Sequence, residues 1–201
     1  MKTKPKYKIA KRLGAPIYEK TQTQKFALSE ARGGRSRKRP SKPSDYKLQL
    51  LEKQKMRLTY GLSEKQFRQY VDLAMEKSHT PISFLFARLE NRLDNVVYRL
   101  GLAKTRRLAR QIVTHGHITL NGRRMNIPSH ELKNGDVVGI REGSREKALF
   151  TDMESRHEAS SVPAWLKFDV KKLTGTVQGT PVYQSTESYF DPEQVLEFYS
   201  R

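Results

Sequence analysis

Three arginines, at positions 106, 107 and 110, are the residues whose type and spacing most clearly predict a chemistry in this sequence. Residues three and four positions apart are neighbours on a helix, so Arg106 and Arg110 would share one face, with Arg107 beside them. A guanidinium group donates hydrogen bonds in a plane and can hold two phosphate oxygens at once. Because residues 105–114 contain no acid, we interpret this face as a phosphate-binding surface rather than an ordinary solvated one.

Polar residues that can hydrogen-bond to phosphate or ribose continue beyond this expected helix. They are His115, His117 and Asn121. Asn121-Gly122 stands between the short runs 117–120 and 123–127 and is typical of a tight β-hairpin turn, whose two central residues need positive φ. The two histidines could also bind a metal ion, but a pair without a third ligand makes a poor site.

Two helices joined by a glycine corner are expected to position these side chains. The apolar stripe of the first recurs at helical spacing and consists of Leu89, Leu93, Val96, Val97 and Leu100. Gly101 can end that helix in the left-handed conformation, and Thr105 can cap the second. The apolar face of the second helix would consist of Leu108, Ala109, Ile112 and Val113.

The first of these helices also carries charges of both signs. Arg92 and Arg99 flank its apolar stripe on one side, and Glu90 and Asp94 flank it on the other. Acids on the same helix could pair with these arginines, so ion pairing and phosphate contact are both open interpretations for them. We expect Asp94 to be a structural partner of an arginine rather than a catalytic acid.

Further helices are predicted on both sides of this unit. One is expected to begin at Ser44-Asp45 and end at Gly61, and another to begin at the capping-box residues 63–66. A third would begin at Thr80-Pro81 and break near Asn91, and a last helix would begin at Asp191. The aromatic and apolar stripe of the second helix fits a core better than a base-stacking platform; it consists of Phe67, Tyr70, Val71, Ala74 and Met75.

The remaining segments are predicted to be strands, turns and a linker. Residues 137–140 and a short segment around 165–170 favour strands, and residues 143–161 favour a short helix with a linker. Residues 174–176 and 179–181 are interpreted as turns, because glycine and threonine dominate them.

Charge and composition indicate a polyanionic partner. The 201 residues include 39 Lys and Arg against 21 Asp and Glu, which gives a formal net charge of +18. Such a balance favours nucleic acid over a membrane surface. The sequence contains no cysteine, which excludes disulfides and thiolate zinc sites. No apolar run approaches the length of a membrane span, and no signal peptide is recognisable.

The first 44 residues carry most of the excess charge. They hold fourteen Lys or Arg and two acids, +12 of the net +18. Apolar residues are sparse here, so we expect no independent core and a basic arm that becomes ordered on nucleic acid. The alternative is a solubilising tail.

Two other classes of protein compete with an RNA-binding function. An enzyme would need paired carboxylates, a nucleophile with its base, or a phosphate-cradling loop, and none stands out. A sequence-specific DNA regulator could also use a helix-turn-helix followed by a hairpin. Preference for folded RNA over duplex DNA at matched salt would separate these readings.

The central segment resembles the small-subunit ribosomal protein S-four family. The resemblance rests on residues 89–101, Thr105-Arg106, 109–111, 115–118, Asn121-Gly122, 127–129 and Gly135-Asp136. This central motif also occurs in pseudouridine synthases, a heat-shock ribosome-binding protein and a tRNA synthetase tail. Flanking segments outside the motif resemble the ribosomal family in particular; they are 44–46, 52–55, 60–62, 66–68 and 163–166.

The resemblance implies an α+β fold in which a mostly helical domain receives an inserted RNA-binding module of two helices and antiparallel strands. The basic extended arm would span residues 1–44 and the first part of the helical domain 45–88. The module would span 89–155, and residues 156–201 would complete the helical domain.

The resemblance also implies a non-enzymatic function. Members of the family bind small-subunit ribosomal RNA early in assembly and lie beside ribosomal proteins S-five and S-three on the path by which messenger RNA enters, where they influence accuracy. We therefore expect a ribosomal protein of the cytoplasm or of an organelle, with no membrane or small-molecule partner. The alternative is a stand-alone RNA-binding regulator or an RNA-modification-associated protein.

Some members of the family bind zinc through four N-terminal cysteines. This sequence lacks them, so we expect no zinc site, no cofactor, Mg²⁺ only through the RNA, and an arm ordered by RNA instead. The residues predicted to contact RNA are Arg35, Arg37, Lys38, Arg39, Lys42, Lys53, Lys55, Arg68, Arg92, Lys104, Arg106, Arg107, Arg110, His115, His117, Asn121, Arg123 and Arg124.

Overall fold

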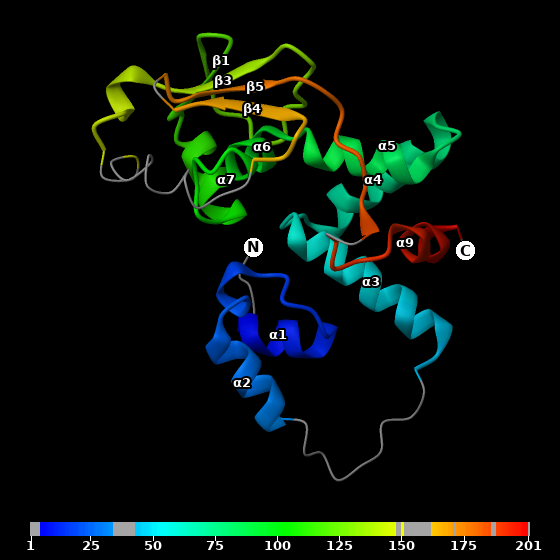
Figure 1. Ribbon diagram of the computed structural model, residues 1–201. Helices are drawn as coiled ribbons and strands as arrows, with labels where there is room; N and C mark the ends of the chain where they lie inside the picture. The colour runs from blue at the N-terminus through cyan, green and yellow to red at the C-terminus, as the bar shows by residue number, and fades with distance from the viewer. Residues whose placement is uncertain are drawn as a thin grey trace. The chain divides into compact units, whose positions relative to one another are not determined.

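The computed structural model describes residues 5–33, 43–147, 150, 162–170, 172–185 and 188–200, without the side chains of residues 30, 32 and 33. The chain divides into two compact units. The first comprises residues 1–85 and 183–201, and the second comprises residues 86–182. Helices and one antiparallel sheet are both present (Figure 1), so the predicted α+β class is confirmed.

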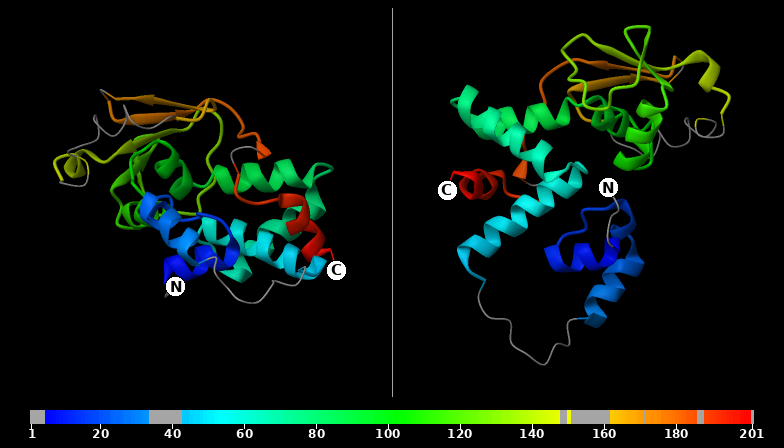
Figure 2. Two further views of the ribbon diagram at one scale, coloured as in Figure 1. Left: turned by 60° about the horizontal axis from the view of Figure 1, so that its bottom comes forward. Right: turned by 180° about the vertical axis from the view of Figure 1, so that it is seen from behind.

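The second unit is a five-stranded antiparallel sheet with two helices on one face (Figures 1 and 2). Helix α5 (Pro81–Glu90) leads into it and breaks at Asn91, as predicted, before α6 (Leu93–Arg99) and α7 (Arg106–Thr114). The sheet order is β2-β1-β3-β5-β4. Its strands are β1 (Ile118–Leu120), β2 (Arg123–Met125), β3 (Val137–Ile140), β4 (Leu166–Asp169) and β5 (Thr174–Val177).

The core of this unit lies between the two helices and the sheet. Leu93, Val96, Val97 and Leu100 are each fully buried, which confirms the apolar stripe of the first predicted helix. On α7, Ala109, Ile112 and Val113 are buried and Leu108 is partly buried against them. Because this stripe of α7 faces the core, the other side chains of α7 form its opposite face.

Local sequence signals set the ends of these elements as predicted. Thr105 Oγ1 accepts a hydrogen bond from the Leu108 backbone N–H at 3.1 Å, which caps α7. Gly101 follows α6 with a φ of 73°. Asn121 and Gly122 have φ angles of 50° and 80°, and they join β1 to β2 in an antiparallel hairpin, with Leu120 opposite Arg123.

The predicted turn at residues 174–176 is wrong, because these residues begin strand β5. The turn lies just before them, where Leu173 has a φ of 52°. Gly175 pairs with Val138 of β3 on one side and with Phe168 of β4 on the other. A Cβ at position 175 would collide with the side chain of Leu100, so glycine admits close packing of α6 on the sheet.

This strand also moves the predicted domain boundary. Because β5 pairs with β3, residues 162–182 belong to the sheet-containing unit rather than to the helical domain. Only residues from 183 onward return to the first unit. Of the predicted short helix within 143–161, the described residues contain only the end of a 3₁₀ turn, η2 (Glu142–Ser144), and residues 148–149 and 151–161 lie outside the description, so the helix stays a prediction.

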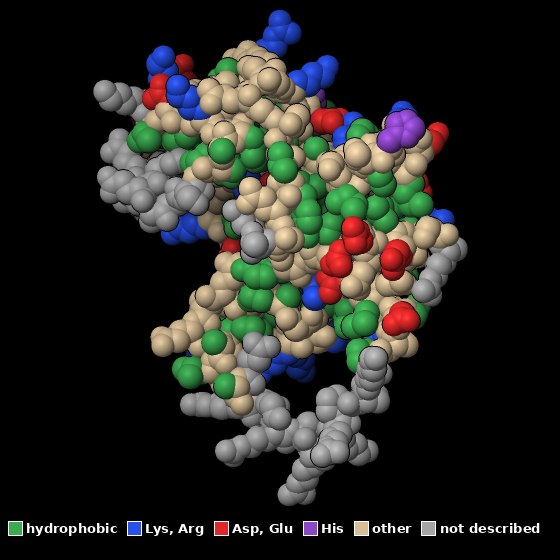
Figure 3. All heavy atoms as spheres, turned by 45° about the vertical axis from the view of Figure 1, so that its right-hand side comes forward, with side chains coloured by type: hydrophobic (Ala, Val, Ile, Leu, Met, Phe, Trp, Pro, Cys, Tyr) green, Lys and Arg blue, Asp and Glu red, His purple; other side chains and the backbone are tan. Residues whose placement is uncertain are grey.

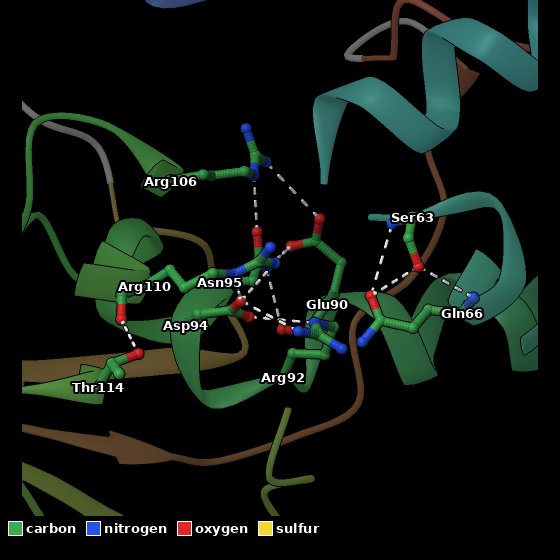
Figure 4. A network of polar contacts seen from close by, with 9 residues as sticks. All are labelled: Ser63, Gln66, Glu90, Arg92, Asp94, Asn95, Arg106, Arg110 and Thr114. Atoms are coloured by element: carbon green, nitrogen blue, oxygen red, sulfur yellow. Dashed lines mark hydrogen bonds and ion pairs between the residues drawn. The ribbon is translucent and has the colours of Figure 1, made fainter. Parts of the chain in front are cut away.

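The first unit contains three helices that pack together, α3 (Asp45–Thr59), α4 (Glu64–Lys77) and α9 (Pro192–Tyr199). Ser44 caps α3, and Asp191 caps α9. Ser63 and Gln66 form the predicted capping box of α4 (Figure 4). Phe67, Val71 and Ala74 are each fully buried, which confirms the core assignment for this part of the predicted stripe, whereas Tyr70 is half-buried and Met75 is 40% exposed.

The described part of the N-terminal segment contradicts the expectation of an extended arm, although its core is not independent. Residues 5–33 form α1 (Lys6–Leu13), a 3₁₀ turn η1 (Glu19–Thr21) and α2 (Gln24–Gly33). Leu51 and Leu58 of α3 pack against the few apolar residues of this segment, so a neighbouring helix supplies the surface that the segment lacks. The buried residues of this small cluster are Ile9, Leu13, Ala15, Ile17 and Tyr18.

Candidate nucleic-acid interface

The arginines of α7 divide into two that make ion pairs and one that projects from the helix. Arg107 is exposed, as is Lys104 just before the helix. Among the described residues, the ion pairs do not include Arg107 or Lys104. Arg106 and Arg110 instead turn toward acidic residues from the junction of α5 and α6 (Figure 4). The arginines thus meet acids that lie outside residues 105–114, which the sequence pattern did not predict.

Asp94 is the first of these acids. Its side chain is 5% exposed, and it is held by arginines from two different elements. Arg92 donates from Nε and Nη2 at 3.1 and 3.0 Å. Arg110 donates from Nε at 2.9 Å, and its Nη2 lies 2.7 Å from the same carboxylate oxygen. These contacts confirm that Asp94 is a structural partner of arginine.

Glu90 is the second acid, and its side chain is 1% exposed. Arg99 donates to both of its carboxylate oxygens, from Nε at 2.8 Å and from Nη2 at 3.0 Å. Asn95 donates to Glu90 at 3.0 Å and accepts from Arg106 Nε at 2.8 Å. Asn95 therefore links Glu90 to Arg106, whose guanidinium also lies over the ring of Tyr98 with 4.4 Å between Cζ and the ring centroid.

The network keeps an excess of positive charge. Its two carboxylates face four guanidinium groups, which leaves a formal charge of +2. Arg92 is 5% exposed, whereas Arg99, Arg106 and Arg110 are 32%, 19% and 35% exposed. The negative charge is therefore inside and the excess positive charge reaches the surface. Such an arrangement can attract a polyanion with cations that are already held in place.

A second group of cations gathers at the end of the hairpin. Arg123, Arg124 and His115 are exposed, and the guanidinium of Arg124 lies over Gly116. His117 is partly buried, with its Nδ1 2.9 Å from Ser144 Oγ. Burial lowers the pKa of His117, and so do the positive charges around it, those of Lys147, His115, Arg141 and Arg124 in decreasing order.

Arg141 and Lys147 are basic residues at this end that the sequence analysis missed. Both are exposed, and the lowered pKa of His117 records their proximity. Arg141 follows β3 directly, and its backbone N–H donates to the His117 carbonyl at 2.9 Å. The sequence shows only that Arg141 follows a predicted strand. The pairing of that strand, β3, with β1 is what brings Arg141 to His117.

Asn121 has a different environment from the one its predicted role suggests. Its side-chain amide donates to Asp136 at 2.8 Å, and its side-chain oxygen accepts from the Val137 backbone N–H at 2.8 Å. These bonds join the β1–β2 turn to the start of β3. Asn121 is therefore a structural residue of the hairpin in this structure, and its contact with RNA stays a prediction.

The predicted RNA contacts of the first unit also lie in varied environments. Lys53 is 6% exposed, and its Nζ lies 2.8 Å from Glu64 and 4.4 Å from the ring centroid of Phe198, a placement that does not favour contact with RNA. Lys55 pairs with Glu52 at 2.6 Å. Arg68 is exposed beside Asp72 at 3.6 Å. The predicted residues Arg35, Arg37, Lys38, Arg39 and Lys42 lie outside the described residues.

The N-terminal helices offer further exposed cations in the first unit. Lys8, Lys11 and Arg12 of α1 are exposed, and so are Lys20 and Lys25. Lys11 Nζ donates to Ser29 Oγ of α2 at 2.8 Å, which ties the two helices together. This part of the predicted basic arm is thus a folded surface rather than an extended segment.

One hollow in the first unit has the opposite charge. Its volume is about 560 Å³, and its lining includes Glu52, Asp191, Glu193 and Tyr183. Figure 3 shows a face on which acidic side chains gather among hydrophobic ones. Acids at this hollow do not suit a polyanion.

The described part of the chain contains no candidate metal cluster and no candidate membrane span. No group of three or more His, Cys, Asp or Glu side chains there could hold a metal ion. Among the same residues, no helix combines the length and the apolar character that crossing a bilayer requires.

Comparison with known proteins gives matches along the whole chain. Residues 91–138 match the S4 domain family, and residues 1–93 match the ribosomal protein S4/S9 N-terminal domain family. The small ribosomal subunit protein uS4 of Herpetosiphon aurantiacus is 40% identical over 207 residues, which covers 99% of this chain and 98% of that protein. The uS4 protein of Roseiflexus castenholzii is 42% identical over 204 residues, with 98% and 97% covered. That of Syntrophomonas wolfei is 43% identical over 169 residues, with 84% and 81% covered.

Proposed function

Because this chain belongs to the uS4 family of small ribosomal subunit proteins, we propose that it binds small-subunit ribosomal RNA directly through the cationic surface of its second unit. Membership of the family makes the chain a structural ribosomal protein and not an enzyme. Its place is therefore the ribosome and its partner ribosomal RNA. The proposal concerns which surface makes the contact and what the contact does.

The observation that carries the proposal is the division of charge on α6 and α7. Acids are buried, whereas Lys104, Arg107 and the partly exposed guanidinium groups of Arg106 and Arg110 lie at the surface of the same short segment. This segment falls within the residues that match the S4 domain family. Folded RNA offers dense phosphates and accessible ribose groups, which such a surface can bind by charge and shape.

The hairpin end extends this surface. His115, Arg124, Arg141 and Lys147 surround His117, and His117 precedes β1, which follows α7 after a short corner. Phosphate groups along one RNA strand could therefore meet cations from the helix and then from the sheet. The exposed cations of α1 and α2 supply a further basic surface in the first unit.

The finer parts of the function follow from the family. We propose that binding occurs early in the assembly of the small subunit, and that neighbouring S-five and S-three proteins and messenger RNA on its path into the ribosome are contacts in the finished particle. An influence on accuracy would follow from those contacts. Mg²⁺ would act by folding the RNA, and the ribosome would be that of a bacterial cytoplasm or an organelle.

A binding experiment with matched competitors tests the proposal. The purified chain is titrated against the five-prime domain of small-subunit ribosomal RNA, against unrelated structured RNA of the same length, and against duplex DNA, all in the same salt and Mg²⁺. The ribosomal RNA should bind most tightly, and its affinity should fall steeply with salt, as expected when several phosphates are neutralised. Equal affinity for all three ligands would contradict the proposal.

Nuclease or chemical footprinting then locates the surface on the RNA. The parent chain should protect a defined set of positions. A variant with Lys104→Glu and Arg107→Glu should lose part of that protection at a concentration where the parent is saturated. Unchanged protection would place the contact elsewhere on the chain.

A further inference from the structure

We propose that the buried carboxylates of Glu90 and Asp94 are positioning residues for RNA recognition, which hold Arg106 and Arg110 in the orientation that a specific RNA site requires. The inference rests on the proposed function, because it assigns a role within the same surface. It separates the cations of that surface into two kinds. Arg106 and Arg110 would recognise the shape of the RNA, whereas Lys104 and Arg107 would supply attraction to any polyanion.

The contacts at Asp94 fix the orientation of Arg110. Asp94 receives two donors from Arg110 and two from Arg92, so that guanidinium groups from α7 and from the α5–α6 junction converge on one carboxylate. Arg110 remains 35% exposed while it makes these contacts. A guanidinium group carries five N–H donors in a fixed plane. Fixing one edge on a buried carboxylate therefore fixes the direction of the other edges as well.

Arg106 is fixed in a different way but to the same effect. Asn95 accepts from its Nε, the ring of Tyr98 lies beneath its guanidinium, and Glu90 lies 4.0 Å from its Nη2. Asn95 and Glu90 are 2% and 1% exposed, so these supports cannot move freely. Asn95 and Glu90 (Figure 4), together with the ring of Tyr98, set both the plane and the position of the guanidinium.

Arginines that are already ordered also lower the energetic cost of binding. Ordering a long side chain on binding costs conformational entropy, and a side chain that is already ordered avoids that cost. Burying a carboxylate also carries a desolvation cost, which a purely solvated cationic face would not incur. Both acids lower the net charge of a surface that attracts a polyanion. Their presence beneath Arg106 and Arg110 is therefore better explained by orientation than by charge.

When Asp94 is neutralised, a role for charge and a role for orientation predict opposite changes in the affinity for ribosomal RNA. Asp94→Asn has nearly the same shape as the parent and raises the formal net charge from +18 to +19. If charge alone governs binding, this variant should bind every RNA more tightly. If Asp94 positions Arg110, the variant should bind the ribosomal RNA fragment about tenfold or more weakly, as expected when a charge-assisted contact is lost, while unrelated RNA binds as tightly as before or more tightly.

Glu76→Gln is the matched control. It makes the same carboxylate-to-amide change, and the same change of net charge, at an exposed position of α4. It should leave the preference for ribosomal RNA unchanged. Folding of both variants is checked by circular dichroism and thermal melting before binding is measured, because Arg92 loses its buried counterion in Asp94→Asn.

A second variant decides the question if Asp94→Asn does not fold. The double substitution Arg106→Lys with Arg110→Lys keeps every charge but replaces two planar groups by ammonium groups, which cannot hold the same two-point contacts. Both side chains are partly exposed, so the fold should survive. Orientation predicts a loss of about tenfold or more for the ribosomal RNA fragment and little change for unrelated RNA.

The outcomes separate this inference from the proposed function. If the parent chain does not prefer ribosomal RNA, the proposed function fails. If the parent prefers it and the lysine variant, properly folded, binds it as tightly as the parent does, only the positioning role is overturned. A rise in affinity of folded Asp94→Asn for ribosomal RNA would overturn the positioning role as well. A selective loss in either variant supports it.

Discussion

The two units each contain a buried ionic network, and the two networks place opposite charges inside. In the first unit Lys53 is the buried member: its side chain is 8% exposed, its partner Glu64 is 48% exposed, and the rings of Phe198 and Tyr199 lie beside its ammonium group. In the second unit the acids are buried, and three of the four arginines reach the surface.

The network of the first unit joins helices to one another, whereas the network of the second unit presents charges that can bind a partner. Lys53 and Glu64 join α3 to α4, and the Tyr199 hydroxyl donates to Glu64 at 2.7 Å, which attaches α9. Burial raises the pKa of Tyr199, and its bond to Glu64 raises it further. That network presents an acid outward. The network of α6 and α7 presents cations outward, and only the second arrangement suits a polyanion.

The largest expected effect is the loss of a buried acid. Asp94→Ala should lower the free energy of unfolding by about 3–5 kcal/mol, because it leaves Arg92 buried without a counterion. Urea denaturation of the variant and the parent measures the difference. Asp72→Ala is the control, and should change stability by about 0.5 kcal/mol or less because its ion pair is at the surface. A loss below about 1 kcal/mol for Asp94→Ala would mean that this network does not stabilise the fold.

The next effect is on RNA binding without a change of stability. Lys104→Glu with Arg107→Glu should weaken binding to the ribosomal RNA fragment roughly a hundredfold, because two charge-assisted contacts of about 1.5 kcal/mol each are lost. Both residues are exposed, so the melting temperature should hardly change. Filter binding and thermal melting measure the two quantities.

Lys167→Glu with Lys172→Glu gives the matched control for that pair. These lysines are exposed on β4 and on the turn after it, in the same unit. The control makes the same change of net charge. If it weakened RNA binding as much as the variant of α7 does, total charge rather than the α7 surface would determine affinity.

A smaller effect is expected from His117. Burial and the surrounding cations hold its pKa below the usual 6.5 in the protein without RNA. A nearby phosphate opposes those positive charges and raises the pKa, so the protein should take up a proton on binding. Affinity should then rise as the pH falls through the window just below 6.5. Titration calorimetry in two buffers measures the proton uptake.

The stability of the protein without RNA should change in the other direction. Because the pKa of His117 is lower in the folded chain than in the unfolded chain, its contribution to stability is fully present above pH 6.5 and is lost as the pH falls. His117→Gln should remove both dependences. Tighter binding at low pH that persists in this variant would assign the effect to another group.

The smallest effect is expected from the buried lysine of the first unit. Lys53→Met should change the free energy of unfolding by no more than about 1 kcal/mol, because a flexible apolar chain can replace the lysine stem while Glu64 stays half exposed to water. RNA affinity should be unchanged. A marked loss of affinity in a folded variant would support the contact with RNA that the sequence pattern predicted for Lys53.

The sequence by itself determined the local features of this protein. The caps at Ser44, Ser63 and Thr105 and the turn at Asn121-Gly122 stand where they were predicted, because each depends on hydrogen bonds or backbone angles within a few residues. The net charge indicated a polyanionic partner, because net charge is a property of composition and does not depend on the fold. Motifs along the sequence also indicated the protein family, which the family matches confirm.

Only the tertiary structure decided which charges face outward and which segments share a core. Residues 174–176 have the composition of a turn, but they form strand β5 because β5 pairs with β3 and Leu100 packs on Gly175. The N-terminal helices have a core because Leu51 and Leu58 of α3 complete it. Lys53 and Arg106 are both cations near apolar residues in the sequence, yet one is buried beneath aromatic rings and the other lies above buried acids. Burial and ion pairing depend on residues that are distant in the chain, so a local pattern cannot set them.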